Sequence, residues 1–181
     1  RNLELTQNLQ GGLDNTLASI LDKTATPMGS RLLKRWLNFP LRDIDILTSR
    51  QAATSAIIQA DIFADIHHQL KQLGDIERIV SRIALRSARP RDFARVRNAL
   101  LALPELHGTL ASCTLDGALA TIVNDIQPLP TVAELLSKAI VENPPVLIRD
   151  GGVIAPGYDR ELDKLRDLSQ GATDFLHQLE Q

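Results

Sequence analysis

The chain has 181 residues, of which 44% are hydrophobic, 23% charged and only 3% aromatic, and its formal net charge at pH 7 is −2. This length allows one medium-sized domain with a substantial core, whereas the near-neutral charge disfavours a self-sufficient nucleic-acid binder. The single cysteine, Cys113, excludes an internal disulfide and a cysteine-ligated metal cluster, and no apolar run is long enough to cross a bilayer. Because the apolar residues are mostly Leu, Ile and Ala, the composition favours an all-α fold.

Helical periodicity and capping residues predict an irregular multi-helix bundle. Before the first helix, the weak alternation of residues 2–6 indicates a short strand or an extended segment, and Asp14 or Asn15 is the expected first cap. Pro104 is expected to end one helix and start the next, because proline disfavours a helix interior. The predicted helices begin at or beside Thr16, Pro27, Asp43, Asp61, Asp75, Pro90, Pro104, Thr114, Thr131 and Asp159.

The stretch 24–41 carries the clearest helix. Thr26 is a capping residue, Pro27 suits the first helical position, and Pro40 prevents the helix from continuing. Trp36 is the only tryptophan, and its burial would make this helix the structural core around which the chain is organised. The apolar stripe of this helix consists of Met28, Leu32, Leu33, Trp36 and Leu37.

Residues 146–154 read differently from the rest of the chain. Two runs rich in β-branched residues, 146–148 and 153–154, flank Asp150 and a Gly-Gly pair. That pattern predicts a short β-hairpin.

The last predicted helix, from Asp159, has apolar residues three and four apart. Such a narrow seam pairs with one partner helix and leaves the other faces in water. Residues 159–181 carry a net charge of −3, so we expect a solvated arm; the alternative is that the helix folds back onto the body. The seam leucines are Leu162, Leu165, Leu176 and Leu179.

No catalytic, cofactor-binding or metal-binding constellation is found in the sequence. One stretch, residues 74–100, contains seven arginines against three carboxylates. It could form a phosphate-facing or domain-facing surface, or its arginines could pair with nearby carboxylates and helix ends. The candidate surface residues are Arg78, Arg82, Arg86, Arg91 and Arg95.

Three separated blocks resemble the MutS DNA mismatch-repair family, and bacterial members most. They are residues 16–37, which contain Thr-Pro-Met-Gly-Ser-Arg-Leu-Leu-Lys-Arg-Trp-Leu, residues 88–92 (Ala-Arg-Pro-Arg-Asp), and residues 144–158 followed by Glu161-Leu-Asp163. The chain begins at Arg1 and stops inside a helical pattern, which also leads us to expect a piece of a longer protein.

The resemblance implies a position in that parent. Residues 1–158 would be the helical core domain that follows a connector domain, and residues 159–181 the start of a lever helix that leads to a clamp domain. The parent would be a cytoplasmic, nucleoid-associated dimer that binds mismatched DNA, hydrolyses ATP with Mg²⁺ in a separate domain, and recruits MutL. The family's mismatch-reading Phe-x-Glu and its ATPase motifs are absent, so no such residue is assigned; Phe63-Ala-Asp65 lies within a predicted helix and is rejected.

Three hypotheses follow. The first is a mechanical coupler that is not itself an enzyme but belongs to a DNA-dependent ATPase. The second is a DNA-backbone-binding helical module that uses the Arg78–Arg97 surface. The third is a helical adaptor that dimerises through the Leu162–Leu179 seam.

Overall fold

The computed structural model describes residues 3–179, with side chains described through residue 171, and this part of the chain is predominantly helical. The all-α expectation is confirmed. The helices are α1 (Leu17–Leu21), α2 (Pro27–Asn38), α3 (Ile44–Gln59), α4 (Phe63–Leu73), α5 (Ile76–Ala84), α6 (Pro90–Ala111), α7 (Gly117–Asp125), α8 (Pro130–Ala139) and α9 (Arg160–Leu179). A short 3-10 turn covers Ile148–Asp150.

Side-chain caps set several of the helix starts. The Thr26 hydroxyl accepts from the Gly29 N–H at 3.0 Å, and Asp43 accepts from the N–H groups of residues 45 and 46. Four expected caps are wrong. Asp116, rather than Thr114, caps α7, and α8 begins at Pro130 without a side-chain cap, although Thr131 is the expected cap. Thr16, rather than Asp14 or Asn15, caps α1, and Asp61 lies in a left-handed conformation (φ +54°) just before α4, which has no side-chain cap.

Helix α6 is one continuous helix, so the expected break at Pro104 is wrong. A proline in a helix interior removes one backbone hydrogen bond and costs about 3 kcal/mol or more, so packing of the flanking turns has to offset that cost. Here Ala99 and Leu106, on either side of Pro104, are both buried in the main core. Tertiary packing therefore outweighs the local preference to stop.

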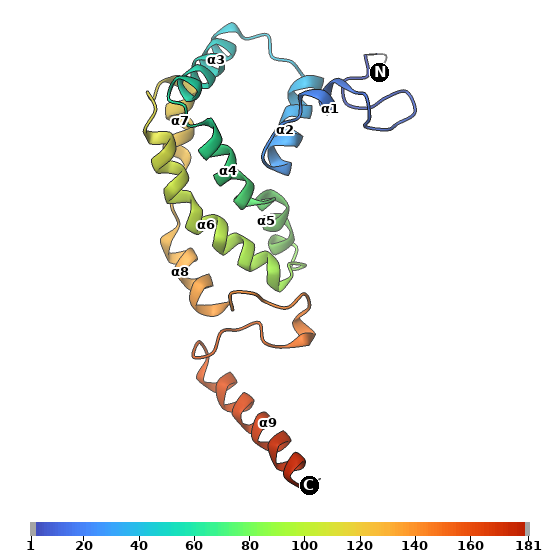
Figure 1. Cartoon of the computed structure of the whole chain (residues 1–181), viewed down its shortest axis with the longest axis vertical. Coiled ribbons are helices and arrows are strands. Elements are labelled where there is room, and N and C mark those ends of the chain that lie inside the picture. Colours follow the sequence, from blue (N-terminus) through green and yellow to red (C-terminus); the bar gives the residue numbers. More distant parts are fainter. Residues whose placement is uncertain (1–2, 180–181) are drawn as a thin grey trace.

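The hydrophobic core lies between α4, α6 and α7, with α3 packed against α7 (Figure 1). Its buried residues are Ile66, Leu73, Ala99, Leu106, Leu110, Cys113, Leu119 and Val123. Helix α8 packs on the first half of α6, and α5 packs beside it.

Helix α2 is not the structural core that its periodicity predicts. No residue of α2 is buried; Trp36 is 41% exposed and Leu32 is 46% exposed. Met28, Leu33 and Leu37 are only half-buried. With α1, this helix forms a separate lobe beside the body (Figure 1). An apolar stripe shows that a helix face needs a neighbour, but not that this neighbour lies within the same 181 residues.

The hairpin expected at 146–154 does not form. The first run leads into the 3-10 turn, and Ile154 instead makes an isolated antiparallel bridge with Ile140, directly after α8. Two backbone bonds hold this bridge: Val141 donates to the Val153 carbonyl at 3.1 Å, and Ala155 donates to the Ala139 carbonyl at 2.8 Å. Residues 153–154 therefore pair with the chain at the end of α8, and not with residues 146–148 as the hairpin prediction required.

Helix α9 extends away from the body (Figure 1), with Asp159 accepting from the N–H groups of residues 161 and 162. Leu162 is half-buried and Leu165 is 60% exposed. The side chains of Leu176 and Leu179 lie outside the described residues, so the leucine seam stays a prediction.

Candidate functional site

Three of the five candidate arginines gather around one hollow, where the end of α5 meets the start of α6. Arg82, Arg91 and Arg95 line it together with Arg89, which the candidate set omitted. We call this hollow, of about 590 Å³, the arginine pocket. Its lining residues are Arg82, Ser87, Arg89, Arg91, Asp92, Arg95 and Val146.

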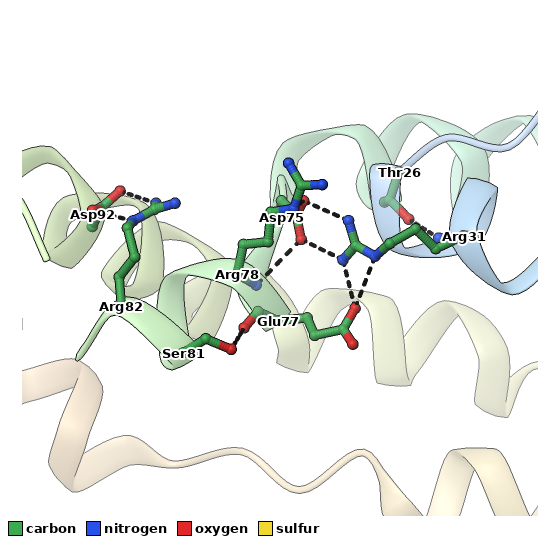
Figure 2. A network of polar contacts seen from close by, with 9 residues as sticks. Thr26, Arg31, Asp75, Glu77, Arg78, Ser81, Arg82 and Asp92 are labelled. Atoms are coloured by element: carbon green, nitrogen blue, oxygen red, sulfur yellow. Dashed lines mark hydrogen bonds and ion pairs between the residues drawn. The ribbon is translucent and has the colours of Figure 1, made fainter. Parts of the chain in front are cut away.

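Arg82 and Asp92 form a two-pronged ion pair at this pocket (Figure 2). Arg82 Nε donates to Asp92 Oδ2 at 2.9 Å, and Arg82 Nη2 donates to Asp92 Oδ1 at 2.5 Å. Asp92 is 5% exposed and also accepts from the Arg89 N–H at 3.0 Å. The guanidinium of Arg82 lowers the pKa of the Asp92 carboxyl, and that carboxylate raises the pKa of Arg82. Carboxylate pairing is therefore the role that the structure gives Arg82.

The other two candidates do not join this pocket. Arg78 lies on α5 with its Nε 3.5 Å from Asp75 Oδ2. Arg86 follows the end of α5, is exposed, and has a left-handed backbone (φ +53°). Four-residue spacing would put Arg78, Arg82 and Arg86 on one flank of a continuous helix, but α5 ends at Ala84, so Arg86 lies outside it.

Arg31 fastens α2 to α5 through two carboxylates (Figure 2). It donates to Asp75 Oδ2 at 2.8 Å and to Asp75 Oδ1 at 2.7 Å, and its Nε also donates to Glu77 at 3.2 Å. The hydrogen bonds from Arg31 lower the pKa of Asp75 to about 2. On the other side of α2, the Arg50 guanidinium of α3 lies 4.0 Å from the ring centroid of Trp36, a cation–π contact. Polar contacts, rather than a buried core, hold this lobe to the body.

Arg97 is the buried arginine of α6, with 7% of its surface exposed. Its guanidinium donates to the carbonyls of Ile140 at 3.0 Å, Val141 at 3.1 Å and Glu142 at 3.0 Å. These carbonyls follow the C-terminal end of α8, where the helix dipole is negative and stabilises a cation. Arg97 therefore joins α6 to the segment that leaves α8.

The base of α9 is tied to residues 153–155, which pair with the segment that leaves α8. Arg166 Nη2 donates to the Ile154 carbonyl at 2.8 Å, and Arg166 Nη1 donates to Asp163 at 2.9 Å. Asp163 in turn accepts from the Gly157 N–H at 2.7 Å. The Ile140–Ile154 bridge completes a path from α9 to α6. We call Arg97, residues 139–141, residues 153–155 and Arg166 the joint.

Sequence reasoning did not single out Arg31, Arg97 or Arg166. Arg97 follows Ala94 by three positions, so both lie on one face of α6, and both are buried. The spacing from Ala94 is the one sequence signal for this face, but the carbonyl acceptors of Arg97 lie at residues 140–142 and cannot be read from the sequence. Arg31 pairs with carboxylates more distant in the chain, and Arg166 bonds the Ile154 carbonyl as well as the nearby Asp163, so the fold alone brings Asp75 to Arg31 and Ile154 to Arg166.

Within the described residues, no group of three or more His, Cys, Asp or Glu side chains could hold a metal ion. None of the described helices is both long and apolar enough to cross a membrane. A comparison with protein families matches residues 1–181 to the family model described as MutS domain III.

Proposed function

The chain belongs to the MutS domain III family and is part of a DNA mismatch-repair protein, and we propose that it acts there as a stiff mechanical coupler. Displacement of α9 would be carried through the joint into the helical body. In this proposal residues 1–158 form the core domain and residues 159–181 begin a lever helix towards a clamp domain.

The single observation that carries the proposal is the joint. A helix transmits a displacement only if its base is fixed to a body that deforms little. Arg166 holds the base of α9 to Ile154, the bridge holds Ile154 to Ile140, and buried Arg97 holds Ile140 to α6. All three links involve backbone carbonyls, whose positions are less variable than those of side chains.

We propose that the remaining functions belong to other parts of the parent. Mismatched duplex DNA would bind to other domains of a dimer, and ATP with Mg²⁺ would bind in a separate ATPase domain. The connector, clamp and ATPase domains would be the partners of this chain, and MutL would be recruited by the assembled protein.

The two rival hypotheses have less support. Arg82 is neutralised by Asp92 and Arg97 is buried against carbonyls, so the Arg78–Arg97 stretch does not present a continuous cationic stripe to a DNA backbone. For the adaptor hypothesis, Leu165 is exposed on α9, but half of the proposed seam lies beyond the described side chains.

The experiment is an ATPase assay on the full-length parent carrying Arg166→Ala. Without its guanidinium the base of α9 loses its bond to Ile154, so we expect stimulation of turnover by mismatched DNA to fall about tenfold. ATP turnover without DNA and affinity for mismatched DNA should stay within about twofold of the unchanged parent, because Arg166 belongs to neither the proposed ATPase domain nor the proposed DNA-binding domains.

Arg160→Ala is the matched control, since Arg160 is an exposed arginine on the same helix. It should leave the stimulation unchanged. Full stimulation in the Arg166→Ala protein would show that the joint does not carry the coupling.

A further inference from the structure

The arginine pocket continues into a second, apolar hollow of about 280 Å³. Arg89 and Val146 line both hollows. The floor of the second one includes Pro90 and the run from Val146 to Arg149. Val146 is 41% exposed and Ile148 is 72% exposed, so aliphatic surface lies open directly beside the guanidinium groups.

The pocket has more positive charge than its own carboxylate can neutralise. Asp92 is the carboxylate of the pocket, and it is occupied by Arg82. Within residues 3–171, no carboxylate forms an ion pair with Arg89, Arg91 or Arg95. Arg91 Nε donates to the Pro144 carbonyl at 3.2 Å. The planar guanidinium of an arginine without a carboxylate partner has the geometry to bind a carboxylate with two parallel hydrogen bonds.

We propose that the two hollows together are a docking surface for an extended acidic segment of a protein partner. Carboxylates of the segment would bind in the arginine pocket, and a neighbouring aliphatic side chain would cover Val146 and Ile148. This inference does not depend on the coupling role proposed above.

Charge and shape favour a peptide over a nucleic acid as the occupant. A peptide carries one or two carboxylates and an apolar side chain, which matches a concave basic pocket with an aliphatic floor. A duplex presents a continuous row of phosphates and needs a long cationic surface, whereas this chain has a net charge of −2. An aliphatic floor offers no benefit to a phosphate backbone.

The test is fluorescence anisotropy of the 181-residue chain with a labelled peptide of about eight alternating Glu and Leu residues. We expect saturable binding that weakens as salt is raised from about 50 to 300 mM. A peptide with Gln in place of Glu lacks the carboxylates for the arginine pocket, and one with Ser in place of Leu lacks the aliphatic side chains that would cover Val146 and Ile148. Each should bind about tenfold more weakly or worse.

The double variant Arg89→Gln and Arg95→Gln should weaken binding of the Glu-Leu peptide by about tenfold or more. Both side chains belong to exposed residues, so circular dichroism should show an unchanged fold. The matched control is Arg35→Gln with Arg42→Gln, two exposed arginines outside both hollows, and it should change affinity less than about twofold.

Four results would overturn the inference. They are no saturable binding up to about 1 mM peptide, equal binding of the Leu-to-Ser peptide, no effect of the Arg89 and Arg95 changes, or tighter binding of a labelled DNA duplex that depends on those two arginines.

Discussion

The guanidinium groups of Arg82 and Arg97 belong to the same residue type, yet their surroundings give them different roles. Arg82 faces a buried carboxylate and forms a charge-balanced pair. Arg97 faces three carbonyls at the end of α8 and has no carboxylate in contact among the described side chains. Since arginine keeps its charge when buried, its role is decided by the acceptors placed opposite it.

Replacing Arg97 by Ala should lower the free energy of unfolding by about 2–4 kcal/mol, because three carbonyls lose a buried charged donor. Arg97→Lys should cost less, since an ammonium keeps the charge but reaches fewer carbonyls. Urea unfolding followed by circular dichroism measures both. Arg149→Ala, at an 82% exposed side chain, is the control and should stay within about 0.5 kcal/mol of the original protein. If Arg97→Ala and Arg149→Ala lowered the free energy of unfolding equally, the role of Arg97 in the joint would be contradicted.

The ion pair of Asp75 with Arg31 makes the attachment of α2 depend on pH. The pKa of Asp75 is lowered from 3.8 to about 2 in the folded chain, so the ionised form stabilises the fold. Its contribution is complete above about pH 4 and is lost as the pH falls towards 2. Trp36 fluorescence reports on α2 directly, and we expect it to change across this acid range.

Asp75→Asn is the control for this transition. Asn can still cap α5 but cannot carry the charge that Arg31 pairs with. The acid-induced change in Trp36 fluorescence between pH 4 and 2 should therefore shrink in this variant. An identical titration curve in both proteins would assign the change to other carboxylates.

At the scale of the elements, local signals place helix starts better than helix ends or joins. Thr26 and Asp43 act within a few residues of their helices, so the sequence alone locates them. Pro104 acts locally too, but burial of Ala99 and Leu106 overrides it and leaves α6 continuous. The same contrast between local and tertiary effects applies to two helical glycines, Gly117 and Gly171.

Gly171→Ala should stabilise α9 by about 1 kcal/mol, because a methyl group there meets no neighbouring atom and alanine favours the helix. The gain in helix content is measured as a stronger circular dichroism signal at 222 nm.

Gly117→Ala should instead destabilise the chain by about 1–3 kcal/mol. Gly117 has φ +49°, and an added Cβ would lie 2.6 Å from Ser49 Oγ, which accepts a bond from Ala118. A stabilised Gly117→Ala chain would show that α3 and α7 are free to separate.

In the whole molecule, the apolar core and the most regular apolar stripe are in different places. The core lies between α4, α6 and α7, whereas α2 is held at the side by Arg31 and by the stacking of Arg50 on Trp36. Helix α9 leaves at the opposite end of the body (Figure 1). The body is therefore packed around one apolar core and carries two attachments, α2 and α9, at which polar contacts are found.

Leu106→Ala should cost about 2–5 kcal/mol, since Leu106 is 5% exposed and its removal leaves a cavity. Trp36→Ala should cost only about 1–2 kcal/mol, because the ring is 41% exposed and loses mainly partial burial and one cation–π contact. Urea unfolding at 222 nm compares the two without relying on tryptophan emission. If both variants lost the same free energy of unfolding, Trp36 would contribute as much as a core residue, and the placement of α2 outside the core would be contradicted.

The sequence by itself determined the helical class, the caps at Thr26, Asp43 and Asp75, and the family. These depend on residue type and short spacing, which act over a few residues and need no knowledge of the fold. The resemblance placed residues 16–37, 88–92 and 144–158 in one family, and the family match covers the same chain.

Only the tertiary structure decided which apolar stripe is buried, which run pairs with Ile154, and which arginines face an acceptor. Each of these depends on groups far apart in the chain, such as Arg97 with Glu142 or Arg31 with Asp75. A local pattern states that a side chain needs a partner, and the fold alone determines which partner comes within a few ångströms.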